Sequence, residues 1–477
     1  MTEVRVRFAP SPTGYLHVGG LRTALYNFLF ARHHKGKLIL RIEDTDQSRK
    51  VDGAVENLIT SLNWAGIDFD EGIGKGGDHG PYYQSQRLDI YRKYIDQLMD
   101  QGDAYPCFCT TEDLEAMRTE QILKKQPPRY DGRCRRLTKA ESQEKLKQNI
   151  PYVCRMKVIH SRGNYQVKDL IRGNVSFKPS QIDDQVLMKS DGFPTYHLAS
   201  VVDDHLMNIT HVIRGEEWLP STPKHLQIYE YLGWEPPLFA HLPLLLNPDR
   251  SKLSKRQGDV ATEDFREKGY LPECMINFVA LLGWNTSDTK EIFSLEELIG
   301  AFSLERVGKA GAIFDIAKLN WMNQQYFKQT PIDEMMGLLK PYLPAEIQAF
   351  PLEQQKKMVA VVRDSMMTLP DVKERLALFL LEKPEFSAEL DQKMKSPEAQ
   401  SIFNAFLEKV QPISELNSEN FLSLMKEVQK ETGIKGKQLW GPMRIAVTLV
   451  EQGPELPLVV EILGKQKCVN RIKSLIL

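Results

Sequence analysis

The sequence predicts an α/β protein, in which a parallel sheet is interrupted by an inserted α+β module and followed by an all-α segment. A strand, a helix and a second strand follow one another over residues 4–43, and this order requires a parallel sheet. Residues 104–190 differ from the preceding segment in composition and pattern, with paired cysteines, a Lys/Glu-rich stretch and short predicted strands. Residues 331–477 show helical periodicity without hairpin signals.

Composition describes a soluble, globular chain of more than one domain. Its 477 residues are 42% hydrophobic and 26% charged, and this length exceeds what one hydrophobic core supports. The apolar runs are far shorter than a bilayer span, and the first expected strand begins at about Val4, which leaves no room for a targeting peptide. Six cysteines in so long a chain make no disulfide framework. We expect a cytoplasmic protein without a membrane partner.

The formal net charge of −1 does not by itself indicate a polyanion partner. A nucleic acid would need lysines and arginines clustered on one face, and the sequence does not reveal such clustering. Evidence for an RNA partner must therefore come from motifs.

The chain is organised around the loop that joins its first strand to its first helix. Residues 4–8 alternate apolar and basic side chains, and residues 21–32 carry apolar side chains at helical spacing. Between them, Pro10, Pro12 and Gly14 exclude regular structure and shape the loop.

His17, Gly19 and Gly20 stand where this loop enters the helix. The first turn of a helix binds anions through its free N–H groups and its dipole, and glycine lets a ligand lie against the backbone. The spacing is neither that of a P-loop nor that of the dinucleotide fingerprint. The loop and helix start therefore predict a nucleotide-phosphate site of another kind. The alternative is an ordinary Pro/Gly loop before a helix.

Residues 37–43 complete the strand–helix–strand unit as a buried strand. In such sheets, ligands bind beyond the carboxyl ends of the strands. Arg7 and Glu43, near the ends of the first two strands, are therefore expected beside the same crevice. A later strand, 209–214, brings Arg214 to its carboxyl end and adds it to this group.

A second basic loop lies far along the chain and holds Lys252 and Lys255. Two lysines three positions apart on a flexible loop suit a mobile clamp, because they can follow phosphates as charge builds on leaving diphosphate. Taken alone, the pattern is common and more typical of a solvated basic loop. Its place after the α/β segment and the insertion favours the clamp.

The two loops together resemble the signature motifs of class I aminoacyl-tRNA synthetases. Residues 17–20 (HVGG) resemble the "HIGH" motif, and residues 252–256 (KLSKR) resemble the "KMSKS" motif. The longer form of the first motif, residues 10–20, is similar to that of the glutamyl/glutaminyl branch, and the match extends over nearly the whole chain. The sequence is therefore identified as a member of the bacterial-type glutamyl-tRNA synthetase family.

The resemblance implies a fold and a division of the chain. A Rossmann-like catalytic domain with an inserted module would be followed by an α-helical anticodon-binding domain. The glutaminyl sister family ends in β-barrels, so the helical pattern of the last segment favours glutamate. The expected parts are catalytic halves at 1–103 and 191–258, an acceptor-stem-binding module at 104–190, a helical stem-contact region at 259–330 and the anticodon domain at 331–477.

The resemblance also implies the reaction and its partners. L-Glutamate would be activated by ATP, with Mg²⁺, to glutamyl-adenylate, and then transferred to the 3′-terminal adenosine of tRNA(Glu), with release of diphosphate and AMP. The first step needs no protein nucleophile, so catalysis consists of positioning and charge stabilisation. The protein is expected to act as a monomer.

Individual residues receive roles from the same resemblance. An Arg is suited to the side-chain carboxylate of glutamate and an acidic residue to its ammonium group. The ATP site would be formed by His17, Gly19, Gly20 and Lys255. The groups acting on the reacting phosphates would be His17, Lys252 and Lys255. The glutamate pocket would be formed by Arg7, Ala9, Ser11, Glu43, Tyr196 and Arg214.

The cysteines of the insertion raise the question of zinc. In some relatives this module holds zinc through three cysteines and a histidine. Cys107, Cys109 and Cys134 are present here, but Arg136 stands at the fourth position and Tyr130 is a poor substitute. Structural zinc takes four good ligands, so we expect a metal-free module and assign no metal ligand.

Two other classes of protein share part of this pattern. Small nucleotidyltransferases have the His/Gly loop and the sheet, but they are shorter and lack the insertion and the helical tail. A catalytically silent tRNA-binding relative would be expected to lose His17 or Lys255, and both are present. ATP–diphosphate exchange with glutamate distinguishes the three classes.

Overall fold

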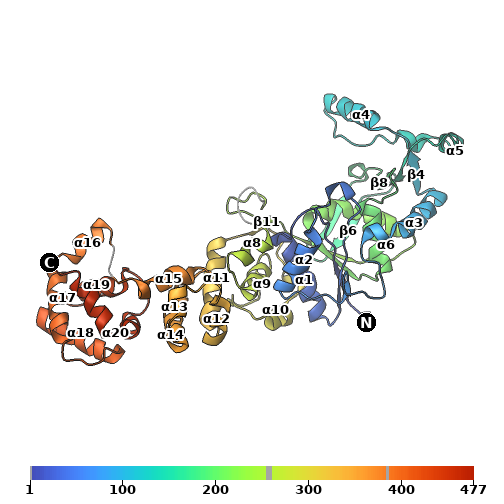
Figure 1. The fold of residues 1–477 in the computed structure, drawn as a ribbon. Coiled ribbons are helices and arrows are strands. Elements are labelled where there is room, and N and C mark those ends of the chain that lie inside the picture. Colours follow the sequence, from blue (N-terminus) through green and yellow to red (C-terminus); the bar gives the residue numbers. More distant parts are fainter. Residues whose placement is uncertain (1–2, 254–259, 383–385, 477) are drawn as a thin grey trace. The chain divides into compact units, whose positions relative to one another are not determined.

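The helices and strands of the computed structural model fall into two units, and Figure 1 colours them along the chain. The structure describes residues 3–253, 260–382 and 386–476. Unit 1 comprises Met1–Asp264 and Met275–Asp315, and unit 2 comprises Phe265–Cys274 and Ile316–Leu477. In the described ranges, no helix combines the length and the apolar character that crossing a bilayer requires.

The first sheet of unit 1 is parallel throughout and confirms the predicted start of the chain. Its strands, in the order β1-β2-β3, are β1 (Arg5–Phe8), β2 (Lys37–Leu40) and β3 (Glu71–Gly72). Helix α1 (Val18–His33) connects β1 to β2. It buries Leu21, Leu25 and Phe28, as their helical spacing predicts.

The second sheet of unit 1 combines strands from two distant parts of the chain. In the order β7-β6-β10-β9, it contains β6 (Tyr165–Asp169), β7 (Gly173–Phe177), β9 (His211–Gly215) and β10 (Leu238–Leu242). Strand β10 pairs in parallel with β9 and β6, whereas β6 and β7 form an antiparallel hairpin. The Thr210 N–H donates to the Arg5 carbonyl at 2.9 Å, so β9 begins beside β1.

A third sheet and two helices form the α+β module. Its antiparallel strands, in the order β4-β5-β8, are β4 (Ala104–Cys107), β5 (Val153–Met156) and β8 (Val186–Met188). Helices α4 (Thr111–Leu123) and α5 (Lys139–Lys147) each begin with a capping box, in which a threonine and an acidic residue three positions later satisfy each other's backbone N–H. Hairpin β6–β7 comes from the same stretch of sequence, so this stretch contributes to two sheets.

Further helices pack against these sheets or continue the chain. They are α2 (Ala54–Trp64), α3 (Leu88–Gln101), α6 (Tyr196–Leu206), α7 (Thr222–Tyr231), α8 (Thr262–Glu267), α9 (Pro272–Ala280) and α10 (Leu295–Ala301). A short parallel pair joins β11 (Leu245–Leu246) to β12 (Ala312–Ile313). Helices α3, α6 and α7 share an apolar core that contains Leu98, Val202 and Ile228.

Unit 2 is helical, and its described residues include no strand, which confirms the predicted all-α segment. Its helices are α11 (Ile316–Gln329), α12 (Ile332–Leu339), α13 (Ala345–Gln348), α14 (Leu352–Val362), α15 (Asp371–Leu380), α16 (Ala388–Met394), α17 (Pro397–Lys409), α18 (Ser418–Thr432), α19 (Lys437–Thr448) and α20 (Leu456–Lys473). Gly433 ends α18 in the left-handed conformation that suits glycine. Phe403, Phe406 and Phe421 are fully buried in this unit.

Two adjacent aspartates on α6 hold charged side chains in the interior of unit 1. Asp204 accepts hydrogen bonds from Arg7 Nε at 3.0 Å and from Arg41 Nη1 at 2.9 Å. Asp203 is fully buried and accepts three further hydrogen bonds. Its donors are Gln84 Nε2 at 2.9 Å, Arg87 Nε at 2.7 Å and Tyr91 Oη at 2.8 Å.

Removing the carboxylate at position 203 is expected to destabilise unit 1. In Asp203→Ala, the buried donors would lose their acceptor, which lowers the free energy of unfolding by about 3–5 kcal/mol. Urea denaturation followed by circular dichroism measures the change. The control is Asp100→Ala, on the exposed end of α3, which is expected to stay within about 0.5 kcal/mol of the wild type. Equal unfolding midpoints for the two variants would refute this account of the interior.

Candidate active site

A cavity of about 970 Å³ opens where the parallel strands of unit 1 end. It lies beyond the carboxyl ends of β1, β2 and β9, the usual place for ligands in such sheets. The loop after β1 and the first residues of α1 and α6 complete its walls. The predicted site residues that line it are Arg7, Ala9, Ser11, His17, Gly19, Gly20, Glu43, Tyr196, Arg214 and Lys252.

His17 begins α1 as its N-cap. Its Nδ1 accepts the backbone N–H of Gly20 at 3.1 Å, so a neutral imidazole carries its proton on Nε2. A Cβ added at Gly19 would lie 3.0 Å from His17 Cε1, and one added at Gly20 would lie 2.8 Å from Leu16 Cδ1. The glycines therefore make room for neighbouring side chains, a packing role that the sequence did not indicate.

Arg41, which sequence reasoning missed, holds Glu43 in place from the interior. It is fully buried and donates from Nη2 to Glu43 Oε1 at 3.0 Å. It also shares Asp204 with Arg7, which brings both arginines to one carboxylate. Burial raises the pKa of Glu43, and the charges of Arg41 and Arg7 oppose the shift. The observed strand β2 ends at Leu40, so Arg41 and Glu43 follow it within the stretch 37–43 that the sequence predicts as strand. Their spacing gave a signal for this pair, because residues two apart in extended chain share one face.

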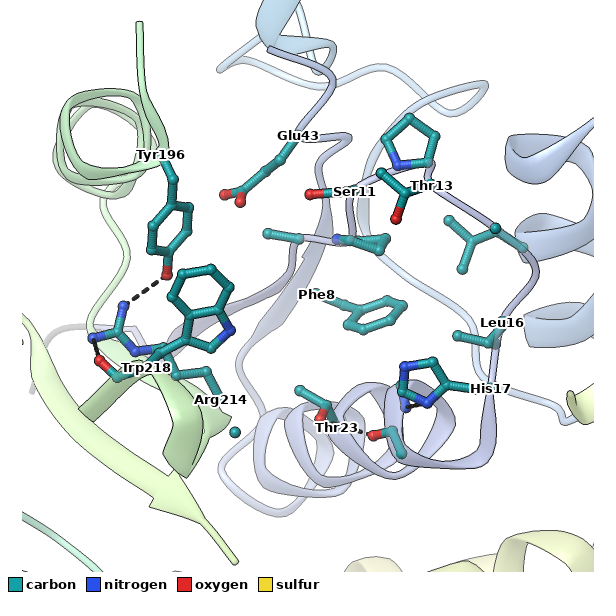
Figure 2. A pocket seen from close by; sticks show the side chains of 18 of the residues that line it. Phe8, Ser11, Thr13, Leu16, His17, Thr23, Glu43, Tyr196, Arg214 and Trp218 are labelled. Atoms are coloured by element: carbon teal, nitrogen blue, oxygen red, sulfur yellow. Dashed lines mark hydrogen bonds between the residues drawn. The ribbon is translucent and has the colours of Figure 1, made fainter. Parts of the chain in front are cut away.

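Tyr196 and Arg214 lie on one side of the cavity and His17 on the other, as Figure 2 shows. Arg214 Nη1 donates to Tyr196 Oη at 2.8 Å. The ring of Trp218 packs against Tyr196 with the centroids 4.3 Å apart. His241 of β10, which sequence reasoning also missed, accepts from Arg214 Nε at 3.0 Å. The guanidinium is therefore held both by a cavity residue and by a buried one.

Of the two predicted lysines, Lys252 lines the cavity. Lys255 lies outside the described residues, within 254–259. Directly after that segment, the Val260 carbonyl accepts the backbone N–H of Val18 at 2.8 Å. Lys252 and Val260 both line the cavity, so the chain borders it on either side of the segment that holds Lys255.

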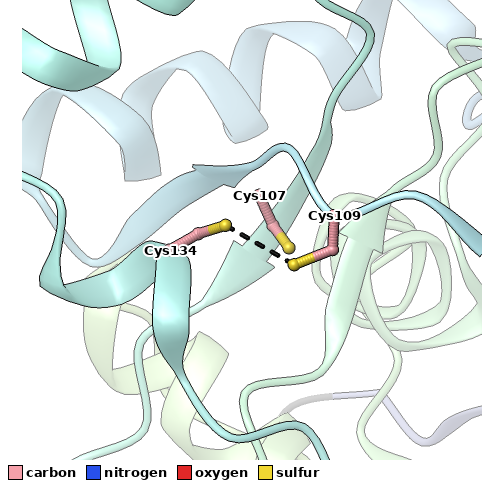
Figure 3. Close-up of side chains that lie close together, drawn as sticks. All are labelled: Cys107, Cys109 and Cys134. Carbon is pink, nitrogen blue, oxygen red and sulfur yellow. Dashed lines mark hydrogen bonds between the residues drawn. The ribbon is translucent and has the colours of Figure 1, made fainter. Parts of the chain in front are cut away.

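Three cysteines of the module converge, and Figure 3 shows their sulfur atoms together. The sulfurs of Cys107, Cys109 and Cys134 all lie within 4.8 Å of one another. The fourth nearby group is Tyr130, whose Oη hydrogen-bonds to Cys107 Sγ at 3.4 Å. Arg136 instead donates to a backbone carbonyl. The three thiols could supply three of the four ligands that a structural zinc site takes.

Comparisons with protein families define the class of protein. Residues 3–321 match the model of the catalytic domain of class I tRNA synthetases (E and Q), and residues 334–476 match the model of an anticodon binding domain. The two matches cover most of the chain and leave a short gap between the catalytic and the helical part. The protein is therefore a class I tRNA synthetase, a class that uses ATP.

Full-length relatives narrow this class. A glutamate–tRNA ligase of Clostridioides difficile (strain 630) is 49% identical over 98% of both chains, and one of Geobacillus stearothermophilus is 46% identical over 99% of this chain and 98% of its own. The crystal structure of a glutamate tRNA ligase from Elizabethkingia meningosepticum in complex with its amino acid matches with a TM-score of 0.90 and 38% identity, over 99% of both chains. The chain belongs to the glutamate–tRNA ligase family, so the predicted family, fold class and enzyme class are confirmed.

Metal analysis of the full chain tests the expectation of a metal-free module. Burial and a hydrogen bond to Cys107 raise the pKa of Tyr130, so its phenol stays protonated and is a weak fourth ligand. We expect substoichiometric zinc after dialysis against a chelator, and a melting temperature that does not depend on added zinc. The variants Cys134→Ser and Cys154→Ser compare a cysteine of the cluster with a buried one outside it. One zinc per chain that is lost only in Cys134→Ser would overturn the expectation.

Proposed function

We propose that this chain joins L-glutamate to tRNA(Glu) in two ATP-dependent steps, as a monomer in the cytoplasm. In the first step, the α-carboxylate of glutamate attacks the α-phosphorus of ATP, and diphosphate leaves with the bonding electrons. In the second, a hydroxyl of the 3′-terminal ribose attacks the activated carbonyl, and AMP leaves. The protein supplies positioning and charge stabilisation for both displacements.

The charge balance around the cavity supports a substrate that has a side-chain carboxylate. Arg7 and Arg41 share Asp204, and Arg41 also pairs with Glu43. In the described part of the chain, no carboxylate oxygen lies within 4.0 Å of an Arg214 nitrogen. The hydrogen-bond partners of Arg214 are Tyr196, Trp218, Thr222, His225 and His241. A buried cation with these partners favours an anionic side chain in the ligand, which glutamate has and glutamine lacks.

The remaining pocket residues complete the proposed contacts with glutamate. Arg7 would join Arg214 at the side-chain carboxylate, and Glu43 would accept the ammonium group. With both ends held, the α-carboxylate is the only charged group of the substrate left to react. The lining residues that complete this proposed pocket are Ala9, Ser11 and Tyr196.

The opposite end of the cavity is the proposed ATP site. A neutral His17 carries its proton on Nε2 and would donate it in a hydrogen bond to a phosphate oxygen. Gly19 and Gly20 lie in the first turn of α1, where the helix dipole favours anions. The N–H groups of Val18 and Gly20 already bond to Val260 and His17. Lys252 and Lys255 would hold the diphosphate as it leaves. Mg²⁺, bound with ATP, neutralises part of the phosphate charge.

The tRNA is proposed to contact several parts of the chain. The match of residues 334–476 to an anticodon binding domain supports recognition of the anticodon by the helices of unit 2. The proposed division is catalytic halves at 1–103 and 191–258, an acceptor-stem module at 104–190, a stem-contact region at 259–330 and an anticodon domain at 331–477.

Exchange of labelled diphosphate into ATP tests the proposed function directly. The assay is run with glutamate or glutamine, each with and without tRNA(Glu). Because Arg214 favours a carboxylate, we expect kcat/KM for glutamate to exceed that for glutamine by about 100-fold or more. No exchange with glutamate under either condition would refute the proposed activity, and a preference for glutamine would refute the proposed substrate.

The phosphate clamp makes a separate prediction about turnover. In Lys255→Ala, the leaving diphosphate would lose a stabilising charge, so kcat is expected to fall by about 10²–10³-fold. The KM for glutamate should stay within about threefold, because the lysine is proposed to act on the leaving group only. Steady-state aminoacylation measures both values, with Lys93→Ala, an exposed lysine on α3, as the control. A wild-type kcat in Lys255→Ala would remove this lysine from its proposed role.

A further inference from the structure

We propose that Asp169 and His241 are positioning residues that fix the orientation of Arg214 and thereby determine the preference for a side-chain carboxylate. Neither side chain is among those that line the cavity. The inference rests on the proposed function, in which Arg214 binds the carboxylate of glutamate. Specificity would then depend on a group two side chains away from the substrate.

Three neighbouring strands bring these residues into a row. Asp169 ends β6, His241 is on β10 and Arg214 is on β9, and the order of the second sheet places β10 between the other two. His241 lies directly opposite Arg214 in the register of β10 and β9. The register of β10 and β6 pairs Asp169 with Phe239, two residues before His241. A carboxylate, an imidazole and a guanidinium thus follow one another across the sheet toward the cavity.

The hydrogen bonds of Arg214 divide between the cavity and the interior. Toward the residues that line the cavity, Nη1 donates to Tyr196 Oη at 2.8 Å and Nη2 to the Trp218 carbonyl at 3.4 Å. From the interior, His241 Nε2 accepts from Nε at 3.0 Å, Thr222 Oγ1 accepts from Nη2 at 2.9 Å, and His225 Nδ1 lies 3.3 Å from Nη1. The long contact with Trp218 is the one that a substrate carboxylate replaces most easily. The interior contacts set the plane of the guanidinium.

The tautomer of His241 follows from its two neighbours. The Nε–H of Arg214 can only donate, so His241 Nε2 must be the acceptor. The ring proton is then on Nδ1, which lies 2.6 Å from Asp169 Oδ2. Burial lowers the pKa of His241 and the hydrogen bond to Asp169 opposes the shift. A neutral ring with its proton on Nδ1 is the form that accepts from Arg214.

Asp169 is itself fixed, because its two oxygens have different partners. Oδ1 accepts three backbone N–H groups, those of Ile171 at 2.9 Å, Arg172 at 2.7 Å and His241 at 3.3 Å. Only Oδ2 faces the imidazole ring. Both Asp169 and His241 are buried, so water does not offer an alternative partner. The backbone of the loop after β6 therefore determines which oxygen of Asp169 faces the His241 ring.

An amide in place of the Asp169 carboxylate would exchange the donor and acceptor nitrogens of the His241 ring. In Asp169→Asn, the amide oxygen would stay with the three backbone donors, and the NH₂ group would face His241 Nδ1. The ring would then accept at Nδ1 and carry its proton on Nε2, directly opposite the Nε–H of Arg214. Two donors cannot bond to each other, so the Nε2 proton would face Thr222 Oγ1, 3.3 Å away, and Arg214 would lose its acceptor for Nε–H. The guanidinium would then turn, although the size of the substituted side chain hardly changes. This is why the substitution tests orientation rather than packing.

The test compares Asp169→Asn with the wild type in the full chain, by exchange and aminoacylation with tRNA(Glu) present. The KM for glutamate is expected to rise by about tenfold or more, and the preference for glutamate over glutamine to fall by a similar factor, as when a supporting hydrogen-bond partner is lost. The KM for ATP should stay within about twofold, because His17 and the lysine loop are untouched. Asp184→Asn is the matched control, since Asp184 is buried, accepts the Val158 N–H at 2.9 Å and does not line the cavity.

The outcomes separate this inference from the proposed function. A wild-type chain without glutamate-dependent exchange would refute both. An active wild type with unchanged glutamate KM and preference in Asp169→Asn, or with the same changes in Asp184→Asn, would refute the positioning role alone. If Asp169→Asn does not fold, as judged by thermal melting, His241→Gln and His241→Leu decide. The glutamine side chain keeps an acceptor and a donor, so it should retain more of the preference for glutamate than leucine. Equal preferences in these two variants would overturn the inference.

Discussion

The geometry of the cavity depends on one carboxylate, Asp204, which is shared by two buried arginines. A buried charge is costly unless it is paired and hydrogen-bonded, so the positions of Arg7 and Arg41 are set together by this group. Because Arg7 belongs to β1, Arg41 directly follows β2 and the carboxylate belongs to α6, the same contacts that join these elements also shape the pocket. Removing one partner would disturb fold and site at once.

Arg214 differs from Arg7 and Arg41 in the kind of group that holds it, and this difference has a chemical consequence. Arg7 and Arg41 are bound to a carboxylate of the chain itself, whereas the described partners of Arg214 are hydroxyl, carbonyl and imidazole groups. Neutral partners fix its direction without cancelling its charge. Among these arginines, Arg214 therefore carries the charge that the described chain leaves uncompensated, whereas Arg7 and Arg41 already have a carboxylate partner.

Local sequence was sufficient for the loop after β1, the order of strand, helix and strand, and the helical character of unit 2, because these depend on short-range patterns such as apolar spacing, proline and glycine. Motifs indicated the candidate residues, and the described ones line one cavity, while their roles stay predictions. Local sequence did not reveal His241 or Asp204, since their partners lie far away in sequence and meet them only through strand register and helix placement. The sequence indicated the glycines beside His17 because glycine lets a ligand approach the backbone. Their close contacts with neighbouring side chains are visible only in the structure.

The place of β6 has a consequence for building chimaeras of this protein. β6 and β7 lie within the stretch that also forms the module, yet they pair with β10 in the second sheet. Exchanging residues 104–190 as one cassette would strip two strands from that sheet and leave β10 as an open edge, a surface prone to pairing with other chains. Junctions that leave the β6–β7 hairpin in place would keep β10 paired with β6. The useful cut sites therefore follow strand pairing rather than the linear order of the chain.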